Sequence, residues 1–145
     1  MLRITKLADY GILILSHMAN QPEQQKTAVE IADELNLPLP VVSKLLKQLT
    51  PAGFLLSSRG AQGGYKLAKD PKAISVADIL AAIEGKLALT DCNEALGLCD
   101  KESACRVKKH WFKIQRLLHN SLSTLSLADL VEEDTTVLAL DALAV

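Results

Sequence analysis

The sequence has few aromatic residues, few cysteines and no long apolar run. Only five of its 145 residues are aromatic, whereas leucine, alanine and isoleucine are abundant. This composition favours helices that pack through aliphatic faces over a sheet-rich fold. No apolar run reaches the length of a transmembrane helix, and the N-terminal segment lacks the apolar stretch and cleavage site of a signal peptide. We therefore expect a cytoplasmic protein that does not associate with membranes.

The cysteines are odd in number and clustered. Cys92, Cys99 and Cys105 are the only three, so they cannot all pair within the chain. Their spacing is wider than the roughly two to four residues usual in zinc knuckles. Thiolates are the ligands of iron-sulfur clusters, which normally take four ligands. We expect a polar loop that holds an iron-sulfur cluster and takes its fourth ligand from elsewhere; structural zinc or a bare-thiol sensor is the alternative.

Positive and negative charges are unevenly distributed, although the net charge is only -1. Residues 38–72 carry six basic side chains against one acid, and residues 105–120 carry five basic side chains and no acid. The segment after residue 126 is acidic and has no basic residue. A basic middle is typical of a surface that faces a polyanion, so nucleic acid stays a candidate partner.

Two short predicted helices form a helix-turn-helix pattern after a longer first helix. Apolar residues at helical spacing predict the first helix between Leu7 and Met18. Thr27, with Glu30 three residues later, predicts a capping box that opens the second helix. Pro40 then suits the first turn of the third helix, which runs to Leu49. Two short helices joined by a tight turn are typical of DNA-binding proteins.

A β-hairpin is predicted directly after the helix-turn-helix. Residues 54–58 and 65–68 have the composition of strands, and the glycine-rich segment 59–64 between them has that of a turn. The glycines lack the spacing of a nucleotide-binding loop, so we interpret the hairpin as the wing of a winged helix. The expected contacts to double-stranded operator DNA are Thr27, Ser43, Lys44, Lys47, Arg59, Gly60, Gln62 and Gly63.

A long helix is predicted after the cysteine loop. Val107, Trp111, Ile114, Leu118, Leu122 and Leu125 recur at intervals of three or four residues and form a heptad-like seam. An apolar seam of this length needs a partner, and two-fold symmetry suits operator binding, so we expect a homodimer. Before the loop, Ser75 and Asp78 predict the start of a further helix that ends at Gly85.

These patterns together predict a mainly α protein: a winged helix-turn-helix with a small β-hairpin wing and a long C-terminal dimerisation helix. The expected divisions are a DNA-binding domain (1–86), a cysteine cluster-binding loop (87–105), a dimerisation helix with a following short helix (106–131), and an acidic and apolar tail (132–145). An enzyme is not expected, because His17, His110 and His119 all lie on predicted helices and no Cys-His-acid arrangement is apparent.

The sequence resembles a family of winged-helix regulators typified by IscR and NsrR. The resemblance covers about residues 1–130 and is carried by residues 7–11, the recognition segment 41–46, the wing RGAQGGYKLA from Arg59, and the three-cysteine loop. In its overall sequence the chain most resembles the branch that regulates the SUF iron-sulfur assembly system. The resemblance implies a homodimeric bacterial transcription factor, usually a repressor, whose DNA affinity depends on an iron-sulfur cluster held by Cys92, Cys99 and Cys105.

The fourth ligand differs between branches of that family. One branch has a histidine three residues after the third cysteine and carries a 2Fe-2S cluster, whereas this chain has Lys108 there and His110 two residues later. The nitric-oxide-sensing branch uses an aspartate on the first helix of the partner subunit and carries a 4Fe-4S cluster, and Asp9 matches it. Asp9 is therefore the expected fourth ligand and His110 the alternative; a solvated role for Asp9 also stays open.

Overall fold

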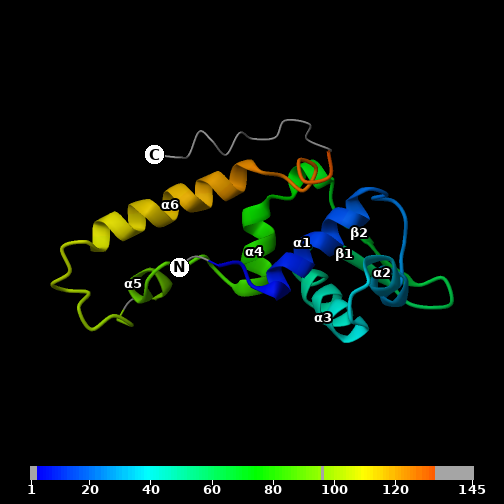
Figure 1. Ribbon diagram of the computed structural model, residues 1–145, viewed down its shortest axis with the longest axis horizontal. Helices are drawn as coiled ribbons and strands as arrows, with labels where there is room; N and C mark the ends of the chain where they lie inside the picture. Colours follow the sequence, from blue (N-terminus) through cyan, green and yellow to red (C-terminus); the bar gives the residue numbers. More distant parts are fainter. Residues whose placement is uncertain (1–2, 96, 133–145) are drawn as a thin grey trace.

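The computed structural model describes residues 3–95 and 97–132. The chain runs through helices, a two-stranded hairpin and a short 3-10 turn in this order: α1 (Lys6–Ala19), α2 (Ala28–Leu35), α3 (Leu39–Leu49), β1 (Leu55–Ser58), β2 (Gly64–Leu67), η1 (Pro71–Ala73), α4 (Val76–Glu84), α5 (Asp91–Glu94) and α6 (Lys108–Thr124). Figure 1 shows the winged helix at one end of the molecule and α5 with α6 extending away from it. The predicted fold, mainly α with a β-hairpin wing, is confirmed.

Local hydrogen bonds set the helix ends. The Thr5 side chain accepts from the Ala8 amide at the start of α1, and Ser75 accepts from the Asp78 amide at the start of α4. Thr27 and Glu30 form the predicted capping box of α2. Asn36 ends α2 in the left-handed conformation, which asparagine tolerates better than most residues. The short turn between α2 and α3 follows from this stop and from Pro38.

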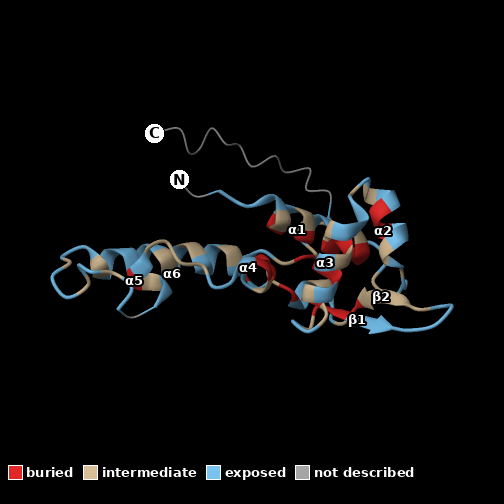
Figure 2. Cartoon of the chain, turned by 90° about the horizontal axis from the view of Figure 1, so that it is seen from below, coloured by how far each residue is buried: buried red, intermediate tan, exposed pale blue. Residues whose placement is uncertain are grey.

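One aliphatic core holds the winged helix together. Its fully buried side chains come from α1, α2, α3, β1 and α4, and include Ile14, Ile31, Leu45 and Ile79. Figure 2 shows these buried residues gathered where α1, α3 and α4 meet, whereas α6 is half-buried or exposed along its length. Burying a side chain of this size stabilises the fold by about 1.5–3 kcal/mol. The core therefore fixes the direction in which α3 presents its outer face.

The wing is an antiparallel hairpin, and one strand is also bridged to the segment before α2. Leu55 pairs with Leu67 and Ser58 with Gly64, and Lys26 forms a bridge with Tyr65. At Gly64 (φ 154°), a Cβ would lie 2.7 Å from the Lys26 carbonyl oxygen, so only glycine allows the two backbones to approach this closely. The wing is thus joined to the segment that precedes α2.

The segment after α6 corrects one prediction. The short helix expected there is wrong: residues 127–131 form turns. Leu127 is buried in the core, its amide donates to the Ile74 carbonyl (2.7 Å), and the Val76 amide donates to the Leu125 carbonyl (2.9 Å). The chain therefore returns to the winged helix after α6. Of the tail expected at 132–145, residues 133–145 lie outside the described residues.

Candidate nucleic-acid interface and cysteine loop

Helix α3 has a buried face and an outward face. Val42, Leu45, Leu46 and Leu49 are buried in the core. Their spacing directs Ser43, Lys44 and Lys47 outward; both lysines are exposed, and neither forms an ion pair with a described residue. The two ammonium groups are therefore free to neutralise an external anion.

A groove of about 550 Å³ lies between α3, the start of α2 and the wing. It brings together five of the eight predicted DNA contacts, namely Thr27, Lys47, Arg59, Gly60 and Gly63. The groove is lined by Lys47 and Arg59 and by no acidic residue. The other three predicted contacts lie outside it: Ser43 and Lys44 on α3, and Gln62 at the wing tip. A concave surface with cations and glycine backbone suits the phosphates of a nucleic acid.

The Thr27 hydroxyl is already used within the fold. It accepts from the Glu30 amide (3.2 Å) and donates to Glu30 Oε2 (2.8 Å). The Thr27 backbone N–H donates to the same carboxylate and, with the hydroxyl, lowers the pKa of Glu30. Glu30 thus carries a negative charge beside the groove at neutral pH. Thr27 therefore lines the groove with its hydroxyl already bonded to Glu30. Lys47 and Arg59 supply the positive charge of the groove.

The wing tip is shaped by close backbone contacts. A Cβ on Gly63 would lie 2.5 Å from the Ser58 carbonyl oxygen and 2.9 Å from that of Gly60, so the tight turn requires glycine there. Gln25 braces the tip: its Nε2 donates to Ser58 Oγ and to the Gln62 carbonyl (2.9 Å). Sequence reasoning missed Gln25, because no local pattern marks a residue that contacts a hairpin more than thirty positions away.

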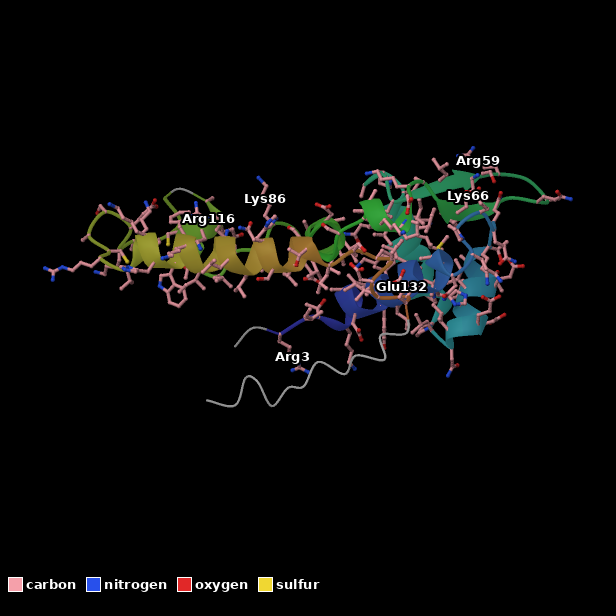
Figure 3. The ribbon with its side chains drawn as sticks, turned by 90° about the horizontal axis from the view of Figure 1, so that it is seen from above. Arg3, Arg59, Lys66, Lys86, Arg116 and Glu132 are labelled. Carbon is pink, nitrogen blue, oxygen red and sulfur yellow. The ribbon has the colours of Figure 1, made fainter. Side chains whose placement is uncertain are left out.

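Figure 3 shows how the basic side chains are distributed. Arg59 and Lys66 lie on the wing at one end of the molecule, and Arg116 lies on α6 at the other end. Arg59 of the wing also lines the groove beside α3. The basic residues of α6 form a separate set.

The cysteine loop lies between α4 and α6 and contacts α6. The Leu89 amide donates to Gln115 Oε1 (3.3 Å), and Asn93 Nδ2 donates to the Trp111 carbonyl (3.3 Å). Cys92 lies on α5 and is buried; Cys99 and Cys105 are half-buried. All three are free thiols. The donor chemistry that an iron-sulfur cluster needs is therefore present on one loop.

The loop contains a buried side-chain polar atom that has no hydrogen-bond partner. Among the described residues, Asn93 Oδ1 is a buried side-chain oxygen with no hydrogen-bond donor, next to Cys92. A buried acceptor of this kind costs about 1–3 kcal/mol. The thiols suit an iron-sulfur cluster in kind, but residues 3–95 and 97–132 contain no group of three or more His, Cys, Asp or Glu side chains arranged to hold a metal ion. Among these residues, the three thiols are thus not brought together at one point.

The three side chains considered as the fourth ligand of the cluster lie in different parts of the molecule. Lys108 Nζ donates to Glu102 Oε1 (2.7 Å), and this hydrogen bond raises the pKa of Lys108, so the amine is protonated and has no lone pair for a metal. His110 is exposed and lies about 200° around α6 from Lys108. Asp9 is exposed on α1, and Figures 1 and 2 both show α1 apart from α5. One chain therefore does not bring Asp9 to the cysteines.

Comparison with known proteins identifies the family. The profile described as "Rrf2: Iron-dependent Transcriptional regulator" matches residues 4–133. The chain belongs to the Rrf2 family of transcriptional regulators. As a member of this family it is a DNA-binding transcriptional regulator. In the described part of this Rrf2 chain, no helix is long and apolar enough to cross a membrane.

Solved structures of other Rrf2-type regulators have the same fold. T. potens IscR is 29% identical with a TM-score of 0.69, and the match covers 90% of this chain and 86% of that chain. CymR, the global cysteine regulator of B. subtilis, is 28% identical with a TM-score of 0.68, at coverages of 90% and 97%. The oxidized form of Staphylococcus aureus CymR is 27% identical with a TM-score of 0.67, at the same coverages.

Proposed function

We propose that this Rrf2 protein is a homodimeric repressor that binds operator DNA and senses iron-sulfur, redox or nitric oxide status through a cluster on its cysteine loop. The observation that carries the DNA-binding part is the groove between α2, α3 and the wing, with Lys47 and Arg59 in its lining. The cluster part is supported by three free thiols on one loop that contacts α6.

The fold suggests how the DNA is bound. Helix α3 enters the major groove, and Ser43 and Lys44 on its outward face contact base edges. Lys47 contacts a phosphate at the edge of the same groove. The wing lies along the backbone, with Arg59 and Gln62 reaching into the adjacent minor groove. The brace from Gln25 holds the wing against the segment that precedes α2.

Helix α6 supports the proposed dimer. Val107, Ile114, Leu117 and Leu125 are 40–57% exposed and lie on one side of the helix. Leu118 and Leu122 lie on the same side of the helix and are half-buried, and α6 also contacts α4. Exposed apolar residues concentrated on one face are typical of a protein interface, and a second copy of α6 covers this face in our proposal.

The proposed cluster is held by Cys92, Cys99 and Cys105, with Asp9 of a second copy or His110 in the fourth position. Bound there, an iron-sulfur cluster supplies redox activity and reactivity towards oxygen or nitric oxide. A carboxylate is a harder ligand than a thiolate, so a site completed by Asp9 is open to ligand exchange at that position.

Contacts already present connect the loop to the recognition helix. Gln48 of α3 donates from Nε2 to the carbonyls of Ala82 and Ile83 (both 3.0 Å) in the last turn of α4. The segment that leaves this turn leads directly into the cysteine loop. A change in the loop therefore shifts α3 through the end of α4 and changes the spacing of the two recognition helices, which must match half-sites about 10 bp apart.

The second candidate function is thiol sensing without a cluster. It is favoured by the fact that the described residues do not bring three metal donors together, and by the similarity to CymR, one form of which is oxidized. The direct outcome of oxidation in this case is a disulfide or a sulfenic acid on the loop.

Two measurements test these proposals. Anaerobic reconstitution with iron and sulfide should give visible absorption and a defined iron-to-protein ratio. A colourless protein that still binds DNA in a thiol-dependent way would instead support the second candidate. For DNA binding, a duplex selected from a random pool should bind the dimer in fluorescence anisotropy, and absence of any selected duplex would refute operator binding.

A further inference from the structure

Lys108 lies where the cysteine loop joins α6 and is bound to the loop through Glu102. Lys108 Nζ lies 2.7 Å from Glu102 Oε1, and Glu102 Oε2 accepts the Gly97 amide at 2.8 Å. The two charged side chains are only 29% and 16% exposed. One carboxylate therefore ties two points of the loop to the start of a long helix.

The same ammonium group lies close to two of the thiols. The hydrogen bond to Glu102 is the main cause of the raised pKa of Lys108, with the smallest contributions from Cys92 and Cys105. Lys108 Nζ lies over the ring of Phe112, one turn later on α6, at 5.9 Å from the ring centre. Lys108 is thus fixed by the loop on one side and by α6 on the other.

We propose that Lys108 is a positioning residue of the cysteine loop. Its ion pair with Glu102 latches the segment between Cys99 and Cys105 against α6, and its charge lies beside the thiols that would hold the cluster. The consequence for the cluster rests on the function proposed above. The latch itself is a property of the protein without any cluster.

The latch acts in two physical ways. It limits the conformations that the loop can adopt, so less conformational entropy is lost when the thiols close on a ligand. It also offsets part of the negative charge that accumulates when three thiolates bind one centre. Both effects slow the opening of the loop and the loss of a cluster held by it.

Hydrogen exchange of the apo protein tests the latch directly. The Glu102 amide donates to the Cys99 carbonyl (3.0 Å), and the Ala104 amide donates to the Lys101 carbonyl (3.1 Å), so both amides report on loop opening. In Lys108→Met and in Glu102→Gln, we expect these amides to exchange roughly fivefold faster, as for the loss of a partly buried ion pair. Lys101→Met is the matched control, because this exposed loop lysine has no ion pair with a described residue.

Reversing both charges tests whether faster hydrogen exchange results from loss of the ion pair or from a general loss of structure. The double variant Lys108→Glu with Glu102→Lys should return exchange of the Ala104 amide to within about twofold of the wild-type rate, and no variant should change the melting temperature appreciably. Single variants that exchange no faster than Lys101→Met, or a double variant as fast as the singles, would overturn the latch.

Cluster decay gives the second readout. After anaerobic reconstitution, visible absorbance in air should be lost several-fold faster in Lys108→Met than in Lys101→Met. Equal decay rates would overturn the effect of the latch on the cluster. A wild-type protein that takes up no cluster would refute the proposed cofactor, while the exchange measurement on the apo protein would still decide the latch.

Discussion

Alanine at position 47 should make operator binding both weaker and less sensitive to salt. Lys47 lines the groove beside Arg59, its side chain is exposed, and it has no ion pair with a described residue. Its charge is therefore available to replace a condensed counterion on a phosphate. The Lys47→Ala substitution removes this contact without disturbing the buried face of α3.

The expected size follows from the number of phosphate contacts. Each neutralised phosphate contributes about -0.9 to the slope of log affinity against log salt, and a homodimer uses each lysine twice, so the slope should become less steep by about 1.8. Over a fourfold rise in salt, from about 50 to about 200 mM, the variant should therefore lose about tenfold less affinity than the wild type. Arg59→Ala should behave in the same way and should also lose preference for A·T-rich flanks.

The assay is fluorescence anisotropy of a selected duplex at four or more salt concentrations. Lys86→Ala is the control, since it removes the same charge from an exposed position that Figure 3 shows away from the wing. If Lys86→Ala changes the salt slope of the affinity as much as Lys47→Ala does, the slope depends only on the net charge of the protein. Unchanged slopes in both groove variants would refute the docking of the groove on DNA.

Three further results are expected. Gly63→Ala should weaken operator binding at least about tenfold, because its Cβ would lie 2.5–2.9 Å from backbone atoms and the wing turn must rearrange; full affinity in the anisotropy assay would contradict this. Ile114→Asp should dissociate the proposed dimer in light scattering, whereas Ser123→Asp, at an exposed position about 180° around α6 from Ile114, should not; a wild-type monomer would refute the interface. Asp9→Ala should shorten the lifetime of the reconstituted cluster in air, and an effect in His110→Ala alone would assign the fourth position to the histidine.

The winged helix could be predicted from the sequence because its signals are local. The capping box at Thr27 and Glu30 fixes the start of α2, and the apolar stripe on α3 fixes the face that is buried. Gly63 allows a close backbone approach within the wing turn that no other residue permits, and the glycines clustered around it mark the turn in the sequence. Each of these features depends on residues within a few positions of one another.

The remaining parts depend on contacts between distant residues, which periodicity does not report. Gln25 and Gln48 have ordinary polar surroundings in the sequence, yet one braces the wing and the other binds the end of α4. The sequence shows Lys108 only as the residue at the place of a histidine ligand in one branch of the family, and its ion pair with Glu102 depends on how the loop folds back. The segment around Leu127 has too short a pattern to show that it packs in the core.

The return of the chain after α6 has a consequence for engineering and for the diversity of such regulators. Ser75 and Ser126 are bridged as neighbouring antiparallel residues, and backbone hydrogen bonds flank the bridge on both sides. Between them, α4 contributes Ile79 and Ile83 to the core of the winged helix, and the cysteine loop and α6 follow α4 and lead back to Ser126. The cysteine loop and α6 thus leave and rejoin one body, so a different chemical input can be exchanged there while α4 and the core that orients α3 are kept.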